Sequence, residues 1–116
     1  MTQIRSISTS TVQSAASPNE LTRRIELTPW DLQLLLVDHI QKGILFFKPT
    51  PSQEKELKGS SVIDYLKTSL SRTLDIFYPL AGRLVMVEND DGKTRSFFVD
   101  CNNLGAQFVH AMVDDL

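Results

Sequence analysis

The most regular hydrophobic pattern of the chain lies between residues 60 and 79. Ser60 or Ser61 can cap the start of a helix there with a side-chain oxygen. Pro79 ends it, because proline disfavours the helical conformation of the residue before it. In between, apolar residues recur every three or four positions, the spacing of one helix face: Val62, Leu66, Leu70, Leu74 and Phe77. The pattern therefore predicts one long amphipathic helix.

After this helix the chain changes to short apolar runs separated by turn residues. Residues 83–87 and 94–99 are predicted to be the two strands of a β-hairpin, because Asp91-Gly92 between them is a strong hairpin signal. Residues 107–113 predict one further strand. Cys101 falls between these strands, where we expect a turn and a buried or half-buried thiol.

Before the long helix, the alternating pattern of residues 21–27 predicts a short edge strand. Thr28 is placed to cap a short helix over residues 30–35, with Pro29 at the first helical position. Asp31 is expected to cap the same turn.

Two further segments lie before the long helix. The apolar run at residues 44–47, stopped by Lys48-Pro49, predicts a buried strand. Residues 49–60 contain proline, glycine and several charges, which favours a solvated loop. Residues 1–20 are polar and rich in Ser and Thr, and we expect a flexible tail there.

The predicted order is strand, strand, helix, strand, strand, strand. It indicates an α/β chain of the α+β type, with a mixed sheet and one long amphipathic helix covering one sheet face. A chain of this size buries only about two-thirds of its unfolded surface. The apolar runs at residues 34–36 and 44–47 need more partner surface than such a chain offers. This is a first indication of a piece of a larger fold.

Composition excludes several classes of protein. The net charge is -2, and the 12 Lys and Arg residues are scattered, which argues against a nucleic-acid partner. No stretch of about 18 apolar residues exists, and the start of the chain lacks the apolar core of a secretory signal. The single cysteine cannot form an internal disulfide. These features favour a cytoplasmic protein with no membrane segment. The histidines, His39 and His110, have no companions at metal-ligand spacing.

Three stretches, covering roughly residues 22–116, resemble the plant acyl-CoA-dependent acyltransferases of the BAHD (HxxxD-type) family in their order and spacing. The most specific is the end of the long helix leading into a Tyr-Pro-Leu-Ala-Gly-Arg segment. The three stretches are Leu27-Thr28-Pro29-Trp30-Asp31-Leu32 followed by Phe46-Phe47-Lys48-Pro49; residues 66–84 with Tyr78-Pro79-Leu80-Ala81-Gly82-Arg83; and Val99-Asp100-Cys101-Asn102 through Ala111 to Asp114.

The resemblance implies a fold and a function. The fold would be the N-terminal part of a chloramphenicol-acetyltransferase-like two-domain fold, with a tail at 1–20 and a partial N-terminal acyltransferase domain at 21–116. The parent enzyme would move an acyl group from acyl-CoA, its co-substrate, to a hydroxyl or amine of a small plant metabolite. Members of the family are usually monomeric, and no cofactor is expected on this chain. The alternative is a non-catalytic, acyltransferase-like interaction protein.

The family's catalytic signature is His-x-x-x-Asp, and His110 to Asp114 fits it literally. We interpret this match as a coincidence, with His110 and Asp114 forming a strand end and its cap. In the family the catalytic His comes later in the chain and runs into a Gly after the Asp, whereas Asp115 follows here. The second signature, Asp-Phe-Gly-Trp-Gly, is absent from this sequence. We therefore expect this chain to lack the catalytic base and to be inactive alone.

Other residues have weaker functional interpretations. By resemblance, His39, Ile40 and Gln41 are candidate residues of the acceptor pocket, although His39 is also explained as a solvated strand residue. Trp30 is expected to be a core anchor. Arg83 is expected to be a structural ion-pair or cap partner rather than a ligand for CoA phosphates.

Overall fold

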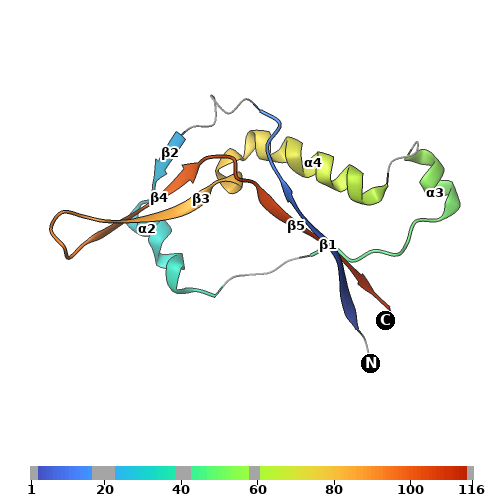
Figure 1. Ribbon diagram of the computed structural model, residues 1–116, viewed down its shortest axis with the longest axis horizontal. Coiled ribbons are helices and arrows are strands. Elements are labelled where there is room, and N and C mark those ends of the chain that lie inside the picture. Colours follow the sequence, from blue (N-terminus) through green and yellow to red (C-terminus); the bar gives the residue numbers. More distant parts are fainter. Residues whose placement is uncertain (1–2, 17–22, 39–42, 58–60, 115–116) are drawn as a thin grey trace.

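The computed structural model describes residues 3–16, 23–38, 43–57 and 61–114 (Figure 1). Helices and strands alternate irregularly along the chain. They are β1 (Ile4–Val12), β2 (Arg23–Glu26), α2 (Pro29–Leu32), the 3-10 helix η1 (Gln33–Leu36), α3 (Pro51–Glu56), α4 (Val62–Ile76), the 3-10 helix η2 (Tyr78–Ala81), β3 (Arg83–Glu88), β4 (Arg95–Cys101) and β5 (Ala106–Val113).

The strands form two antiparallel sheets. In the first, β1 pairs with β5, from Ile4 opposite Val113 to Val12 opposite Ala106, with one irregularity between Ser6 and Ser8. In the second, the strand order is β2-β4-β3, and the β3–β4 hairpin projects to one side in Figure 1. All strand pairs in the described part of the chain are antiparallel. A mixed sheet therefore stays a prediction for a larger fold.

Three helices begin at a side-chain cap. Thr28 and Asp31 form a reciprocal capping box at α2, as predicted, and the backbone N–H of Thr28 lowers the pKa of Asp31. Ser61 caps α4 by accepting a hydrogen bond of 3.0 Å from the backbone N–H of Asp64. Thr50 and Gln53 form a second capping box at α3. Because of α3, the prediction of a solvated loop over residues 49–60 is wrong for Pro51–Glu56, which is helical although exposed to solvent.

Two other expectations are corrected by the structure. Residues 1–20 were expected to be a flexible tail, but Ile4–Val12 forms β1. Its Ser and Thr side chains hide the strand pattern, and its partner β5 lies about a hundred positions later. Residues 44–47 were expected to be a buried strand, but they have no regular structure and Phe47 is 87% exposed. No strand in the described ranges pairs with them.

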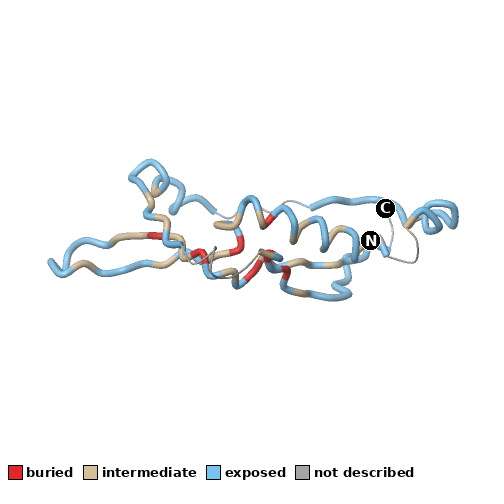
Figure 2. The backbone as a smooth tube through the Cα atoms, turned by 90° about the horizontal axis from the view of Figure 1, so that it is seen from above, coloured by how far each residue is buried: buried red, intermediate tan, exposed pale blue. Residues whose placement is uncertain are grey.

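The buried core of the described residues is small, as Figure 2 shows. Its hydrophobic members are Val12, Leu74, Ala81, Phe98 and Cys101. The radius of gyration is 18.6 Å, whereas a compact domain of this length has about 13 Å. The accessible surface is 9773 Å², about 3,400 Å² more than a compact monomer of the same mass exposes. The chain therefore leaves much apolar surface uncovered, including Trp30, which is 78% exposed and not the expected core anchor.

A hydrogen-bonded cluster ties the end of β1 to α4 and to the loop before β5. The buried Ser14 donates from its hydroxyl to the Asp75 carboxylate at 2.5 Å, and the backbone N–H of Ala16 donates to the same oxygen at 3.0 Å. The backbone N–H of Ser14 also donates to the Asn103 side chain at 2.8 Å. We call Ser14, Asp75 and Asn103 the polar clamp. The Ser14 hydroxyl in particular lowers the pKa of Asp75.

Gly105 lies where the polar clamp and the β1–β5 sheet meet. Its φ of +101° is a conformation that side chains rarely adopt. A Cβ atom there would lie 2.6 Å from Cγ2 of Thr11 and 2.7 Å from the carbonyl oxygen of Val12. Only glycine therefore allows β1 to approach the start of β5 this closely.

We expect Gly105→Ala to lower the free energy of unfolding by roughly 1–3 kcal/mol, because the new Cβ meets backbone atoms in a strained conformation. Gly43→Ala is the matched control, since nothing lies within 4 Å of its Cβ position. Urea denaturation followed by circular dichroism measures both. Equal midpoints for the two variants would contradict the close approach at Gly105.

The hydrogen bonds accepted by Asp75 lead to a second prediction. Its folded-state pKa is lowered, so its contribution to stability is complete above the unfolded-state pKa of about 4 and is lost as the pH falls through the folded value. We expect Asp75→Asn to be less stable than the parent at pH 6. The difference in urea midpoint should shrink towards pH 3. A difference that is constant from pH 6 to pH 3 argues against an ionised Asp75 in the polar clamp.

Candidate functional site

The apparent His-x-x-x-Asp motif lies along β5 and does not form a cluster. His110 is half-buried in the strand, opposite Ser8 of β1. Asp114 follows the strand and accepts two hydrogen bonds from the Arg5 guanidinium, at 3.0 Å from Nε and 2.7 Å from Nη2. Residues four apart in an extended strand are separated by about 13 Å. The carboxylate of Asp114 is thus engaged by β1, where it closes the end of the β1–β5 sheet.

The other candidates from the sequence fall in different places. His39, Ile40 and Gln41 lie outside the described residues. Arg83 has a structural role, as expected, although its partners are backbone atoms: Nη1 donates to the carbonyl oxygens of Gly82 and Gly105, both at 2.8 Å. It thereby ties the start of β3 to the start of β5.

Cys101 ends β4 and is almost completely buried, rather than lying in the expected turn. Burial, and then the negative charge of Asp100, raises the pKa of its thiol above the ordinary value. A raised pKa disfavours the thiolate, which is the nucleophilic form of cysteine. Cys101 is therefore a packing residue, in agreement with the expectation of a buried or half-buried thiol.

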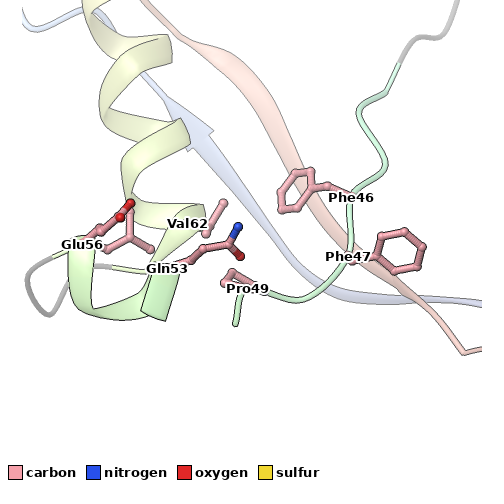
Figure 3. Close-up of a pocket in the computed structure, with 7 residues that line it drawn as sticks. Phe46, Phe47, Pro49, Gln53, Glu56 and Val62 are labelled. Atoms are coloured by element: carbon pink, nitrogen blue, oxygen red, sulfur yellow. The ribbon is translucent and has the colours of Figure 1, made fainter. Parts of the chain in front are cut away.

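An open groove of about 360 Å³ lies between the segment at residues 46–49, α3 and the start of α4 (Figure 3). Figure 3 shows Phe46 turned towards the helices and Phe47 turned away from them. Glu56 is the one ionisable residue of its lining, and Gln53 is engaged in the capping box of α3. The lining consists of Phe46, Phe47, Pro49, Gln53, Glu56, Leu57 and Val62.

This groove can hold apolar groups, but its lining offers no pair of groups for acid–base catalysis. Such catalysis needs a base positioned at the reacting proton. Sequence reasoning missed the groove because it assigned residues 49–60 to a loop. The signal for α3 was nevertheless present in Thr50-Pro51 with Gln53 three positions after the cap.

Metal and membrane sites are equally unsupported. Across residues 3–16, 23–38, 43–57 and 61–114, no three His, Cys, Asp or Glu side chains come together as metal ligands. Within the same ranges, the helices are all too short or too polar to cross a bilayer.

Comparison with known proteins identifies what the chain resembles. Residues 2–116 match the Transferase family. An uncharacterized acetyltransferase of Arabidopsis thaliana is 43% identical over 116 residues, which is 100% of this chain and 25% of that protein. Alcohol acyl transferase 1 (allele GSb) of Malus domestica is 41% identical over 71 residues, 61% of this chain and 14% of that protein.

A third relative is benzyl alcohol O-benzoyltransferase of Petunia hybrida, 30% identical over 98 residues, 82% of this chain and 20% of that protein. The chain thus spans a quarter or less of the length of these relatives.

Proposed function

The chain belongs to the Transferase family, the BAHD acyltransferases of plants, and from that premise we propose that it is scaffold of an acyl-CoA-dependent acyltransferase. The whole enzyme would transfer an acyl group to a hydroxyl or amine of a small plant metabolite. The names of two relatives, an alcohol acyl transferase and a benzyl alcohol O-benzoyltransferase, support acyl transfer to an alcohol. Residues 21–116 would be part of the first half of a chloramphenicol-acetyltransferase-like two-domain fold. The strand β1 would belong to the same half, because it pairs with β5.

In this proposal the chain supplies no catalytic base. One observation carries this view. Both carboxylate oxygens of Asp114 accept hydrogen bonds from Arg5, so the carboxylate is held by Arg5 and not by His110. A catalytic imidazole in acyl transfer takes a proton from the acceptor and needs a third group to orient it. Here His110 is a member of a strand pair, opposite Ser8. The base and the oxyanion donors would come from the rest of the enzyme.

The groove near α3 does not fit acyl-CoA as a binding site. The phosphates of CoA call for arginine, lysine or helix N-terminal N–H groups. The lining instead includes Glu56 and otherwise apolar or amide side chains. Acyl-CoA would therefore be bound as a substrate by other parts of the enzyme. Its small acceptor molecule would likewise be bound elsewhere or by His39, Ile40 and Gln41. A cytoplasmic location is consistent with the free thiol of Cys101.

A non-catalytic interaction protein is the second candidate. The exposed apolar residues favour it, and so do the sheet edges that carry no further strand among the described residues, because such surfaces bind other polypeptides. Solution behaviour separates the two candidates. A monomer with a cooperative thermal transition favours an independent module, whereas an aggregating or molten chain favours scaffold that needs the rest of an enzyme.

The role of His110 is testable in a hybrid enzyme. Residues 2–116 would replace the corresponding segment of the Petunia hybrida benzyl alcohol O-benzoyltransferase, and benzyl benzoate formed from benzoyl-CoA and benzyl alcohol would be measured. We expect the hybrid to form ester, and His110→Ala to retain the rate within about threefold, because loss of a general base costs about 10²–10⁴. Ser8→Ala, at the opposite strand position, controls for disturbance of the sheet.

A folded hybrid that forms no ester would contradict the scaffold proposal. A hundredfold or greater loss in folded His110→Ala, with Ser8→Ala active, would make His110 the base.

The purified 116-residue chain should not release CoA from acetyl-CoA or benzoyl-CoA in the presence of alcohols or amines. Released thiol can be followed with a colorimetric thiol reagent against a buffer blank. Acceptor-dependent release that scales with chain concentration would show that the chain itself is an enzyme.

A further inference from the structure

The groove between residues 46–49, α3 and the start of α4 is shaped by two capped helix starts. In the capping box of α3, the backbone N–H of Thr50 donates to Oε1 of Gln53 at 3.0 Å. The hydroxyl of Ser61 caps α4, and Val62, the first residue of that helix, lines the groove beside α3. Local hydrogen bonds therefore hold these two sides of the groove.

Most of the groove lining is apolar and open to solvent. Phe46 is 48% exposed and Phe47 is 87% exposed, whereas Pro49, Leu57 and Val62 are half-buried. The volume of about 360 Å³ is at the lower end of the range for pockets that hold small molecules, roughly 300–1,000 Å³. A molecule with one ring and a short arm is smaller than this volume, and it would cover apolar surface on binding.

The charge of the lining decides which molecules fit best. Glu56 is the only ionisable residue among the described lining residues, and it makes no salt bridge with another residue of the described ranges. Its carboxylate attracts a cation, and the ring faces of Phe46 and Phe47 also attract an ammonium group. An anion is disfavoured by the carboxylate and by the ring faces alike. Charge complementarity therefore favours an amine.

One lining group favours an oxygen acceptor instead. Oε1 of Gln53 is engaged in the capping box, which leaves the side-chain N–H groups of Gln53 for a ligand. Hydrogen bonds to a charged group are roughly twice as strong as neutral ones, so Glu56 outweighs Gln53. Lys48 and Lys55 adjoin the lining residues in sequence without being part of the lining. Because of these two cations, an anionic ligand is the alternative that a test must separate.

We propose that this groove binds a small apolar amine, with the apolar body against Phe46 and Val62 and the ammonium group at Glu56 (Figure 3). The site binds without catalysing a reaction, because its lining offers no pair of groups for acid–base chemistry. It is therefore not the place where an acceptor of acyl transfer reacts. The chain would thus carry a ligand site of its own in addition to its proposed scaffold role.

Three probes of similar shape and different charge test the proposal. Phenethylamine, phenethyl alcohol and phenylacetate would be titrated at pH 7 into the isotope-labelled 116-residue chain, with binding read from amide chemical shifts. We expect the amine to bind about two- to fivefold more tightly than the alcohol, which is the gain from an exposed ion pair, and phenylacetate to bind most weakly. The amides that shift should be those of residues 53–57 and of Val62.

Two charge-neutralising variants locate the preference. Glu56→Gln should remove the preference for the amine over the alcohol. Glu54→Gln, on the same helix but outside the groove lining, is the matched control and should retain it. Both glutamates are exposed, so neither change disturbs the buried core. Phe46→Ala should weaken all three probes by a similar factor, because it removes apolar contact and leaves the charge in place.

Absent binding of phenethylamine, equal affinity for the three probes or tighter binding of phenylacetate would overturn the proposal. An equal effect of the two glutamate variants, or shifts confined to residues outside the groove, would overturn it as well. The titration of the unsubstituted chain does not depend on any variant folding. Because no acyl-CoA is present, failure of this binding is distinct from failure of acyl transfer in the hybrid enzyme, which concerns the proposed function alone.

Discussion

The pairing of β1 with β5 holds the two ends of the described chain together, and the rest of the structure depends on it. Arg5 and Asp114, which close one end of this sheet, are 109 positions apart in sequence. At the other end, Val12 packs with Leu74 and Ala81 in the main buried cluster. Without this pairing, α4 would have no sheet to cover on its buried side. The cost of closing so long a loop grows only slowly with its length, so a few well-placed contacts can offset it.

The polar clamp explains how α4 is fixed on this sheet despite so small a core. Ser14 links β1 to Asp75 of the helix, 61 positions away, and to Asn103, 89 positions away. A charge-assisted hydrogen bond is stronger than a neutral one and has a defined direction. It therefore adds a directional contact between β1 and the helix to the apolar packing of Leu74, the one leucine that is buried within the described ranges.

The segment that carries the family resemblance is a packing junction. Ala81 is completely buried, and a Cβ at Gly82 would collide with the carbonyl oxygen of Asp100. Arg83 then reaches the carbonyl oxygens of Gly82 and Gly105. The chain therefore needs a small side chain at Ala81, no side chain at Gly82 and a long hydrogen-bond donor at Arg83. This physical demand accounts for the specificity of the Ala-Gly-Arg sequence without any catalytic role.

Local signals in the sequence predicted the elements that depend on local chemistry. The helix at Val62–Ile76 follows from the periodicity of its apolar residues. The hairpin turn depends on Gly92, whose φ is +66°, and the cap of α2 depends on the side-chain oxygen of Thr28. Long-range pairing has no such signal, and β1 was missed because its polar side chains show no alternation. The edge strand β2, by contrast, was visible from its alternation.

The candidate site was less predictable, because a motif is a pattern in sequence and a site is an arrangement in space. His110 and Asp114 match a catalytic pattern, yet the strand separates them and Arg5 binds the carboxylate. The groove near α3 was missed for the opposite reason, since its residues carry no catalytic pattern at all.

The strand predicted at residues 44–47 is not formed, and the reason is physical. Their composition is that of a buried strand, but a strand exists only where another strand accepts its hydrogen bonds. The described chain offers them no such neighbour, so Phe47 stays exposed and the backbone irregular. The strand β3 shows the converse case, because within the described ranges it pairs only with β4 while Leu84 and Met86 stay about half exposed. In both places, apolar side chains stay exposed because the described residues supply no strand for the neighbouring backbone to pair with.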